Sequence, residues 1–451
     1  MASSALIGPE TGPPEGAGPV LAPAGSDSPR LAGERFALNR TEVAVALSDA
    51  LNLVGIEDSG HGKRVAFMAT EVGKAAGLSA DALEDLFLSG LLHDCCVSSN
   101  LVFRKLVGEF DGEESTEHCL AGHELLFGFP PLRPAASIIL HHHDRWDSPA
   151  REQTDPGVAR LANVVFLAHR ADALCSAFRP EDLLMGRGAV RDGIARRSKT
   201  HFAPELVGAF LDASIPEAFW LTLEPRHIER YVEDVVAAAP SERVDVRRLR
   251  QLAGIFARIA DAKSPYTARH SVGVSRVARV LGGLLGMSGD VCDQLELAGL
   301  LHDLGKLHIP DEILEKQAPL DPGEFSTISR RGFETYQILS RLPPFRSLAT
   351  WASFLPEVRS GGGNPFRRRG PRIPFPARAL AVADTFQALM QRRPYRPALE
   401  PDIAVRLLKG IAERGKLDAE IVETLAQNLE LCRAAAVGET AAVAGPAGSG
   451  R

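Results

Sequence analysis

Two stretches of seven residues decide the fold: Leu-Ser-Gly-Leu-Leu-His-Asp at positions 88–94 and Leu-Ala-Gly-Leu-Leu-His-Asp at positions 297–303. Each closes an apolar helical pattern with a histidine and an aspartate. In both halves another histidine opens an earlier helical pattern, and it lies 32 residues before the histidine of the His-Asp pair: His61 precedes His93, and His270 precedes His302. Two copies of one motif at one spacing indicate a duplicated domain.

The sequence around these motifs predicts helices. The segment Gly-Lys-Arg-Val-Ala-Phe-Met-Ala-Thr-Glu-Val that follows His61 places apolar residues at i, i+3, i+4 and i+7, whereas alternating strand patterns are scarce. Pro, Gly and Asp separate the helical segments. We therefore predict an all-α protein of two tandem helical bundles. The bundles span residues 38–180 and 249–433, and a helical connector at 181–248 joins them. The two ends of the chain, 1–37 and 434–451, are rich in Gly, Pro, Ala and Ser, and we expect them to be disordered.

Composition excludes several classes of protein. The 451 residues are 45% apolar and carry a net charge of −6, which argues against binding to DNA, RNA or an anionic membrane. No run approaches the ~18 apolar residues of a spanning helix, and the N-terminus lacks the pattern of a signal peptide. The six cysteines form no Cys-x-x-Cys pair. We expect a reduced, cytoplasmic protein, with a thiolate zinc site as the less favoured alternative.

Histidine is concentrated in one part of the chain. Eight of the 13 histidines lie between His61 and His169. The charge of Asp94 or Asp303 at the end of a buried helix is costly unless it is paired or bound to a cation. A hydrogen-bonded core histidine beside a capping aspartate would explain one such pair. The distant histidine at equal spacing in both halves favours a metal site.

These motifs resemble those of the HD superfamily of metal-dependent phosphohydrolases, and specifically its HD-GYP branch, in two copies. The strongest local match is Leu-Leu-His-Asp-Leu-Gly-Lys at 300–306, followed by Val-Ala-Asp-Thr-Phe-Gln-Ala-Leu at 382–389. The resemblance implies helical bundles and iron, manganese or similar divalent cations. It also implies the hydrolysis of cyclic di-GMP.

For the first half, the resemblance implies a complete set of ligands for two cations. Asp94 would bridge the ions, with a hydroxide as the second bridge, and so be the central catalytic residue. Histidine replaces the family's aspartate at position 169, and His is a competent ligand for the same metals. The family's lysine after the HD pair is Val97 here, and no Gly-Tyr-Pro follows. The implied ligands are His61, His93 and His169 for one ion, His118, His142 and His143 for the other, and Asp94 for both.

The second half keeps a smaller set. The resemblance carries over four ligands, enough for at most one cation: His270, His302, Asp303 and Asp384. Lys306 keeps the family's phosphate-contacting position. Arg331 stands where the family has a ligand histidine, so it would repel a second metal and could bind phosphate instead. The paired histidines are replaced by Leu355-Pro356 before Glu357.

We therefore expect a metal-dependent phosphodiesterase that acts on a cyclic dinucleotide, cyclic di-GMP first, or on a related nucleotide. The first domain would hold two ions, with Fe or Mn favoured and Zn or Ni also compatible. The second domain would regulate, dimerise or help to hold substrate, and the apolar connector could pair two protomers as a homodimer. The alternative is a weak or inactive signalling protein that binds nucleotide, metal or a partner.

Overall fold

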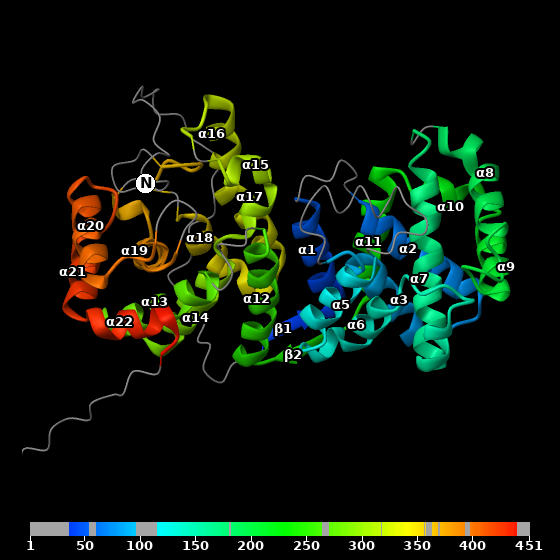
Figure 1. The fold of residues 1–451 in the computed structure, drawn as a ribbon, viewed down its shortest axis with the longest axis horizontal. Helices are drawn as coiled ribbons and strands as arrows, with labels where there is room; N and C mark the ends of the chain where they lie inside the picture. The colour runs from blue at the N-terminus through cyan, green and yellow to red at the C-terminus, as the bar shows by residue number, and fades with distance from the viewer. Residues whose placement is uncertain are drawn as a thin grey trace, which may run out of the picture. The chain divides into compact units, whose positions relative to one another are not determined.

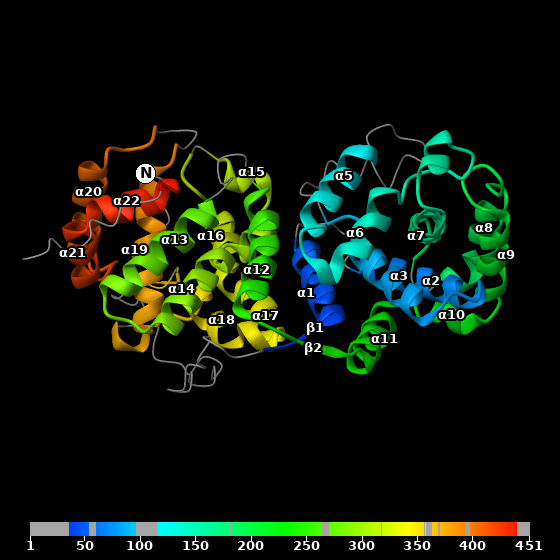
Figure 2. The same cartoon turned by 90° about the horizontal axis from the view of Figure 1, so that it is seen from below.

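The computed structural model shows a chain built almost entirely of helices (Figures 1 and 2), which confirms the predicted all-α class. The described residues form two compact units, one at 37–243 and one from 244 onward. None of their helices is both long and apolar enough to span a membrane. The expected disorder of residues 1–35 and 440–451 lies outside the described residues. The structure describes residues 36–53, 60–95, 115–179, 182–263, 270–316, 318–355, 357, 363–368, 370–392 and 397–439.

A short two-stranded sheet, which the sequence analysis did not anticipate, lies at the start and end of the first unit. It pairs β1 (Phe36–Asn39) with β2 (Ser241–Val244). Asn39 then caps the first helix, because its side-chain oxygen accepts hydrogen bonds from the backbone N–H groups of Thr41 and Glu42. The bundle helices follow: α1 (Arg40–Asn52), α2 (His61–Ala75), α3 (Ala80–Leu92), α5 (Ser115–Leu126), α6 (Arg133–Leu140) and α7 (Pro156–Cys175).

The segment expected to be a connector packs onto this first bundle. Phe202, Phe210 and Trp220 are buried in the same apolar core as residues of α2 and α7. The apolar faces of these helices need a partner surface, and α2 and α7 supply it. The structure therefore places these helices in the first unit, whereas a separate connector was expected to begin at position 181. The helices concerned are α8 (Leu183–Ala195), α9 (Pro204–Ala213), α10 (Glu217–Leu221) and α11 (Pro225–Ala238).

The second unit is organised around α13, which packs against α14 and α19 (Figure 2). Its last helix continues to Val437, beyond the expected end at position 433, because Ala434 and Ala436 are buried. The helices of this unit are α12 (Val246–Asp261), α13 (His270–Leu284), α14 (Gly289–Leu301), α15 (Asp311–Leu314), α16 (Pro322–Ser329), α17 (Arg331–Arg341), α18 (Arg346–Ser353), α19 (Phe375–Met390), α20 (Pro401–Glu413), α21 (Ala419–Gln427) and α22 (Leu429–Val437).

The two units repeat one series of elements, which supports the duplication inferred from sequence. Helices α2 and α13 are both 15 residues long and begin at a histidine, and α3 and α14 are both 13 residues long and end before a His-Asp pair. A glycine brings each helix pair close together. A Cβ atom on Gly90 would lie 2.5 Å from the Cα atom of Ala66, and one on Gly299 would lie 2.6 Å from that of Ser275.

We predict that Gly90→Ala destabilises the first unit by about 1–3 kcal/mol, because the new methyl group overpacks the contact between α3 and the α2 backbone. Hydrogen–deuterium exchange should show faster exchange in α2 and α3, with α13 and α14 as an internal reference. The control is Gly208→Ala in α9, where a Cβ atom meets nothing within 4 Å. Equal protection in the two variants would contradict the close-packing role of Gly90.

Candidate metal centres

Seven predicted ligand side chains of the first half lie together in the first unit. Five helices, or the residues that directly follow them, supply these side chains. His61 is the first residue of α2, and His93 and Asp94 follow α3 directly. The others are His118 in α5, His142 and His143 after α6, and His169 in α7.

The side chains form two adjacent groups. In each group, one potential ligand atom per residue lies within 4.8 Å of every other. In the first group the Nε2 atoms of His61 and His93 are 3.2 Å apart. In the second the Nε2 atoms of His118 and His142 are 3.4 Å apart. The groups are His61, His93, Asp94 and His169, and His118, Cys119, His142 and His143.

Asp94 faces both groups at once. Its Oδ2 atom lies 3.3 Å from His93 Nε2 and 3.7 Å from His61 Nε2, and its Oδ1 atom lies 3.6 Å from His118 Nε2. Both oxygens are buried, and within the described part of the chain neither has a hydrogen-bond partner. A buried carboxylate without donors is costly, and divalent cations would remove that cost.

His169 gives the same indication. Its side chain is fully buried, and neither ring nitrogen finds a hydrogen-bond partner among the described residues. Its ring centroid lies 4.9 Å from that of His93 and 5.2 Å from that of His61. An imidazole left without partners beside other imidazoles is a poor packing residue and a suitable metal ligand. The residues of the first unit therefore fit divalent cations.

Hydrogen bonds behind the centre orient several of these rings. His61 Nδ1 donates to Asp172 Oδ2 at 2.6 Å, and Arg64 Nε donates to Asp172 Oδ1 at 2.7 Å. His93 Nδ1 donates to the carbonyl of Gly90 at 2.9 Å, and His142 Nδ1 to that of Ile139 at 2.7 Å. Each bond leaves Nε2 directed at the centre, as in metal sites whose histidines are held by outer partners.

Sequence reasoning did not assign roles to Arg64 and Asp172. Helical spacing could have found both. Arg64 lies three residues after His61 in α2, and Asp172 lies three residues after His169 in α7. Residues three apart share one helix face, so this spacing could have placed both side chains near the ligands, although it does not show that Asp172 binds His61.

The electrostatics favour neutral imidazoles. Burial lowers the pKa of His93 and His118, and it takes the pKa of His142, His143 and His169 well below the usual value. Neighbouring imidazoles act in the same direction on the last three. His61 is the exception: burial alone would lower its pKa, but the hydrogen bond and charge of Asp172 raise it. A neutral ring has the lone pair that a cation needs.

Two further histidines of this region, His123 and His141, make other contacts. His123 Nδ1 donates to the carbonyl of Ala136 at 3.1 Å, and His141 Nδ1 lies 2.8 Å from Asp144 Oδ2.

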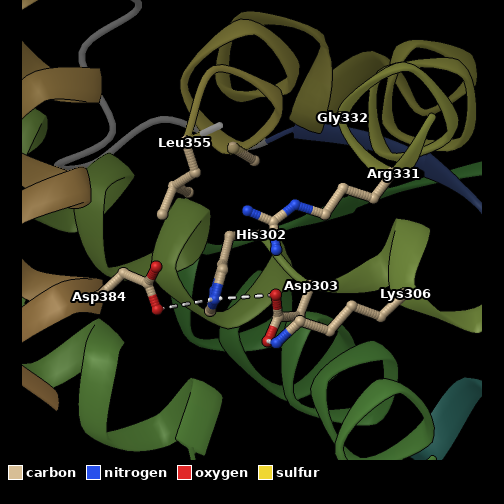
Figure 3. Close-up of a pocket in the computed structure, with 8 residues that line it drawn as sticks. His302, Asp303, Lys306, Arg331, Gly332, Leu355 and Asp384 are labelled. Atoms are coloured by element: carbon tan, nitrogen blue, oxygen red, sulfur yellow. Dashed lines mark hydrogen bonds and ion pairs between the residues drawn. The ribbon is translucent and has the colours of Figure 1, made fainter. Parts of the chain in front are cut away.

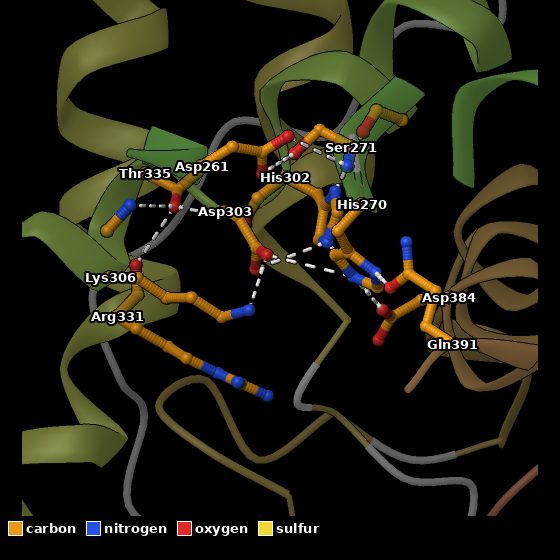
Figure 4. A network of polar contacts seen from close by, with 12 residues as sticks. Asp261, His270, Ser271, His302, Asp303, Lys306, Arg331, Thr335, Asp384 and Gln391 are labelled. Carbon is orange, nitrogen blue, oxygen red and sulfur yellow. Dashed lines mark hydrogen bonds and ion pairs between the residues drawn. The ribbon is translucent and has the colours of Figure 1, made fainter. Parts of the chain in front are cut away.

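The second unit contains a smaller group, drawn in Figure 4. His270, His302 and Asp384 have potential ligand atoms within 4.8 Å of one another. His270 Nε2 lies 3.0 Å from Asp384 Oδ1, and its Nδ1 lies 3.0 Å from Gln391 Oε1. Asp303 falls outside this group and forms an ion pair with Lys306.

A cavity of about 30 Å³ adjoins this group, and Arg331 extends into it beside His302 (Figure 3). Burial alone would lower the pKa of His302, but the negative charge of Asp303 raises it. Internal cations thus neutralise carboxylates here that a metal would otherwise neutralise. The cavity is lined by His302, Asp303, Lys306, Arg331, Gly332, Ala352, Leu355 and Asp384.

The loop beyond this pocket is anchored by Glu357. Its buried carboxylate accepts hydrogen bonds from the backbone N–H groups of Phe366 at 2.7 Å, Arg367 at 3.0 Å and Arg368 at 2.6 Å. This glutamate therefore fixes the segment that follows Gly363-Asn364-Pro365.

Helical bundles that place a His-Asp pair after a buried helix, facing an earlier histidine, define HD-type domains. The HD-domain profile matches residues 254–421. The 3'3'-cGAMP-specific phosphodiesterase 1 of Vibrio cholerae is 31% identical over 396 residues, which cover 87% of this chain and 92% of that protein. The chain belongs to the HD-domain phosphodiesterase family, whose domain implies divalent metal ions.

Two other similarities span most of the chain. The 3'3'-cGAMP-specific phosphodiesterase 3 of the same organism is 27% identical over 421 residues, covering 82% of this chain and 90% of that protein. The crystal structure of the V. cholerae cyclic GMP-AMP specific phosphodiesterase V-cGAP3 superposes with a TM-score of 0.61 at 25% identity, covering 88% of this chain and 99% of that one.

A shorter match is to a protein that is named for a different substrate, cyclic di-GMP. The cyclic di-GMP phosphodiesterase response regulator RpfG of Xanthomonas campestris is 33% identical over 181 residues, which cover 40% of this chain and 47% of that protein.

We predict that Asp172→Asn lowers the metal affinity of the first unit by about 10- to 100-fold, because His61 loses the carboxylate that orients it. Metal content after dialysis against graded chelator measures this. Asp144→Asn is the matched control, since Asp144 is partly exposed and contacts His141. Equal metal retention in both variants would exclude the orienting role of Asp172.

Proposed function

We propose that the protein hydrolyses a 3',3'-linked cyclic dinucleotide at the histidine-rich centre of the first unit. The observation that carries this proposal is the position of Asp94, whose two oxygens face two separate groups of imidazoles. His61, His93 and His169 would hold one cation, and His118, His142 and His143 the other, with Asp94 between them. Iron or manganese is our first expectation, and zinc or nickel suits the same donors.

Two bound divalent cations would activate water and neutralise charge on the phosphate oxygens during an in-line displacement. The residues of this chain set the conditions for that chemistry. The Asp172–Arg64 pair holds His61, and backbone carbonyls hold His93 and His142. Because six donors are neutral and only Asp94 is charged, the loaded centre keeps net positive charge, which favours an anionic substrate.

The choice of substrate rests on the relatives. Those that match more than 80% of the chain are named 3'3'-cGAMP-specific, whereas cyclic di-GMP phosphodiesterases match 24–45% of it. We therefore favour 3'3'-cGAMP as the substrate, ahead of the cyclic di-GMP suggested by the sequence motifs.

We assign the second unit a phosphate-binding role. Lys306 and Arg331 both line its cavity, while His270, His302 and Asp384 could hold at most one cation. Such a pocket would bind a nucleotide phosphate and regulate the enzyme or help to hold substrate. The ion pair of Asp303 with Lys306 also favours the second candidate function, a nucleotide-binding signalling protein of low activity. The homodimer stays a prediction.

Paired variants locate the active centre. We predict that His93→Ala/Asp94→Ala removes bound metal from the first unit and lowers turnover of 3'3'-cGAMP at least 1,000-fold, because one ion loses two of its four protein ligands and the other loses Asp94. His302→Ala/Asp303→Ala should retain most turnover. The assay measures linear product and metal per chain, with iron or manganese supplied without oxygen.

The opposite pattern would place catalysis in the second unit. Unmodified protein that binds cations but cleaves neither 3'3'-cGAMP nor cyclic di-GMP would support the signalling alternative instead.

The second pocket has its own test. In the His93→Ala/Asp94→Ala background, Arg331→Ala should weaken equilibrium binding of 3'3'-cGAMP about 10- to 100-fold, because a charged donor to phosphate is lost. Arg330→Ala is the matched control, since Arg330 pairs with Glu334 on an exposed surface. Unchanged affinity in the Arg331 variant would remove the phosphate-binding role.

A further inference from the structure

We propose that Cys119 is a further protein ligand at the second cation position of the first unit, beside His118, His142, His143 and the shared Asp94. This inference rests on the proposed metal centre and deepens it. It assigns that position a sulfur donor and hence a preference for softer cations such as Zn²⁺ or Fe²⁺ over Mn²⁺ or Mg²⁺.

The geometry places the thiol among the imidazole donors. Cys119 Sγ lies 3.8 Å from His118 Nε2, and the four residues offer ligand atoms within 4.8 Å of one another. Its 3.4 Å contact with His142 is to Nδ1, the nitrogen that donates to the carbonyl of Ile139, so the thiol lies beside the ring whose Nε2 faces the centre. Around one five-coordinate cation with metal–nitrogen bonds near 2.0 Å and metal–sulfur bonds near 2.3 Å, neighbouring donors are roughly 2.8–3.7 Å apart. The 3.4 Å between His118 Nε2 and His142 Nε2 agrees with such a site.

Unsatisfied groups beside the thiol point to a ligand independently of the cysteine. His143 Nε2 is buried and has no hydrogen-bond partner among the described residues, and the same holds for Asp94 Oδ1. Asp94 Oδ1 faces His118 Nε2 at 3.6 Å. His118 and His142 are more than nine-tenths buried. A cation at this position would satisfy the imidazole and the carboxylate together.

Sulfur would make the centre asymmetric. The group around His61 and His169 offers nitrogen and carboxylate donors, whereas the group around His118 adds a thiolate. A coordinated thiol loses its proton to solvent when the cation binds. The added negative charge offsets one of the two charges of that ion, and soft-metal selectivity would follow from this position alone.

Cobalt substitution tests the assignment on the full chain. In a His302→Ala/Asp303→Ala background, the Co²⁺-loaded protein should show near-ultraviolet thiolate-to-cobalt absorption. Zinc X-ray absorption should show a sulfur neighbour at about 2.3 Å. Cys119→Ser should abolish both signals and weaken zinc binding at this position at least tenfold. Cys175→Ser, which changes a buried cysteine of the same unit outside both groups, should leave them unchanged.

A second variant tests whether Cys119→Ser loses the signals only because the protein misfolds. Cys119→His should restore the zinc stoichiometry without the sulfur signals. The inference is overturned if the unmodified protein binds its full complement of cobalt without the absorption, or if the absorption survives Cys119→Ser. Turnover of 3'3'-cGAMP by the same unmodified sample would then leave the proposed function standing, whereas absence of both bound metal and turnover would defeat the proposed function itself.

Discussion

The burial of one carboxylate between two sets of imidazoles governs the first unit. Asp94 follows an apolar helix whose close approach to α2 depends on Gly90, so the charge cannot retreat to solvent without moving α3. Burial would raise its pKa, yet the surrounding histidines, His93 first, lower it. A carboxylate that stays ionised without a donor needs external positive charge. The proposed metal centre would meet this need.

The second unit solves the same problem in another way. Asp303 occupies the corresponding place after α14, but Lys306 supplies an ammonium group within the chain. Arg331 adds a second cation at the cavity where the family has a ligand histidine. Burial would raise the pKa of Asp303, and His302 and Lys306 bring it well below its usual value. The same arrangement of helices thus carries two differently neutralised aspartates. Asp303 is neutralised by side chains of the protein, whereas Asp94 would be neutralised by bound cations.

Sequence reasoning succeeded where a feature depends on spacing along a helix. The interval from His61 to His93 fixed the relation of α2 to α3, and the all-α class followed from apolar periodicity. It failed where contacts depend on tertiary packing. Asp172 binds His61 across 111 residues, a relation that no local pattern contains. The helices after position 181 joined the first core because their apolar faces found α2 and α7 there.

Cys119 illustrates a different limit. It directly follows His118, and successive residues on a helix point about 100° apart, so adjacency gave no reason to expect both side chains at one centre. Only the fold shows that α5 lies against α6 with the thiol beside His142. Donor chemistry and family signature are therefore separate properties of this chain. The profile matches the unit that retains Lys306, whereas the first unit holds more of the residues that can bind cations. A sequence motif indicates evolutionary relationship, whereas metal binding depends on which side chains the fold brings together at one site.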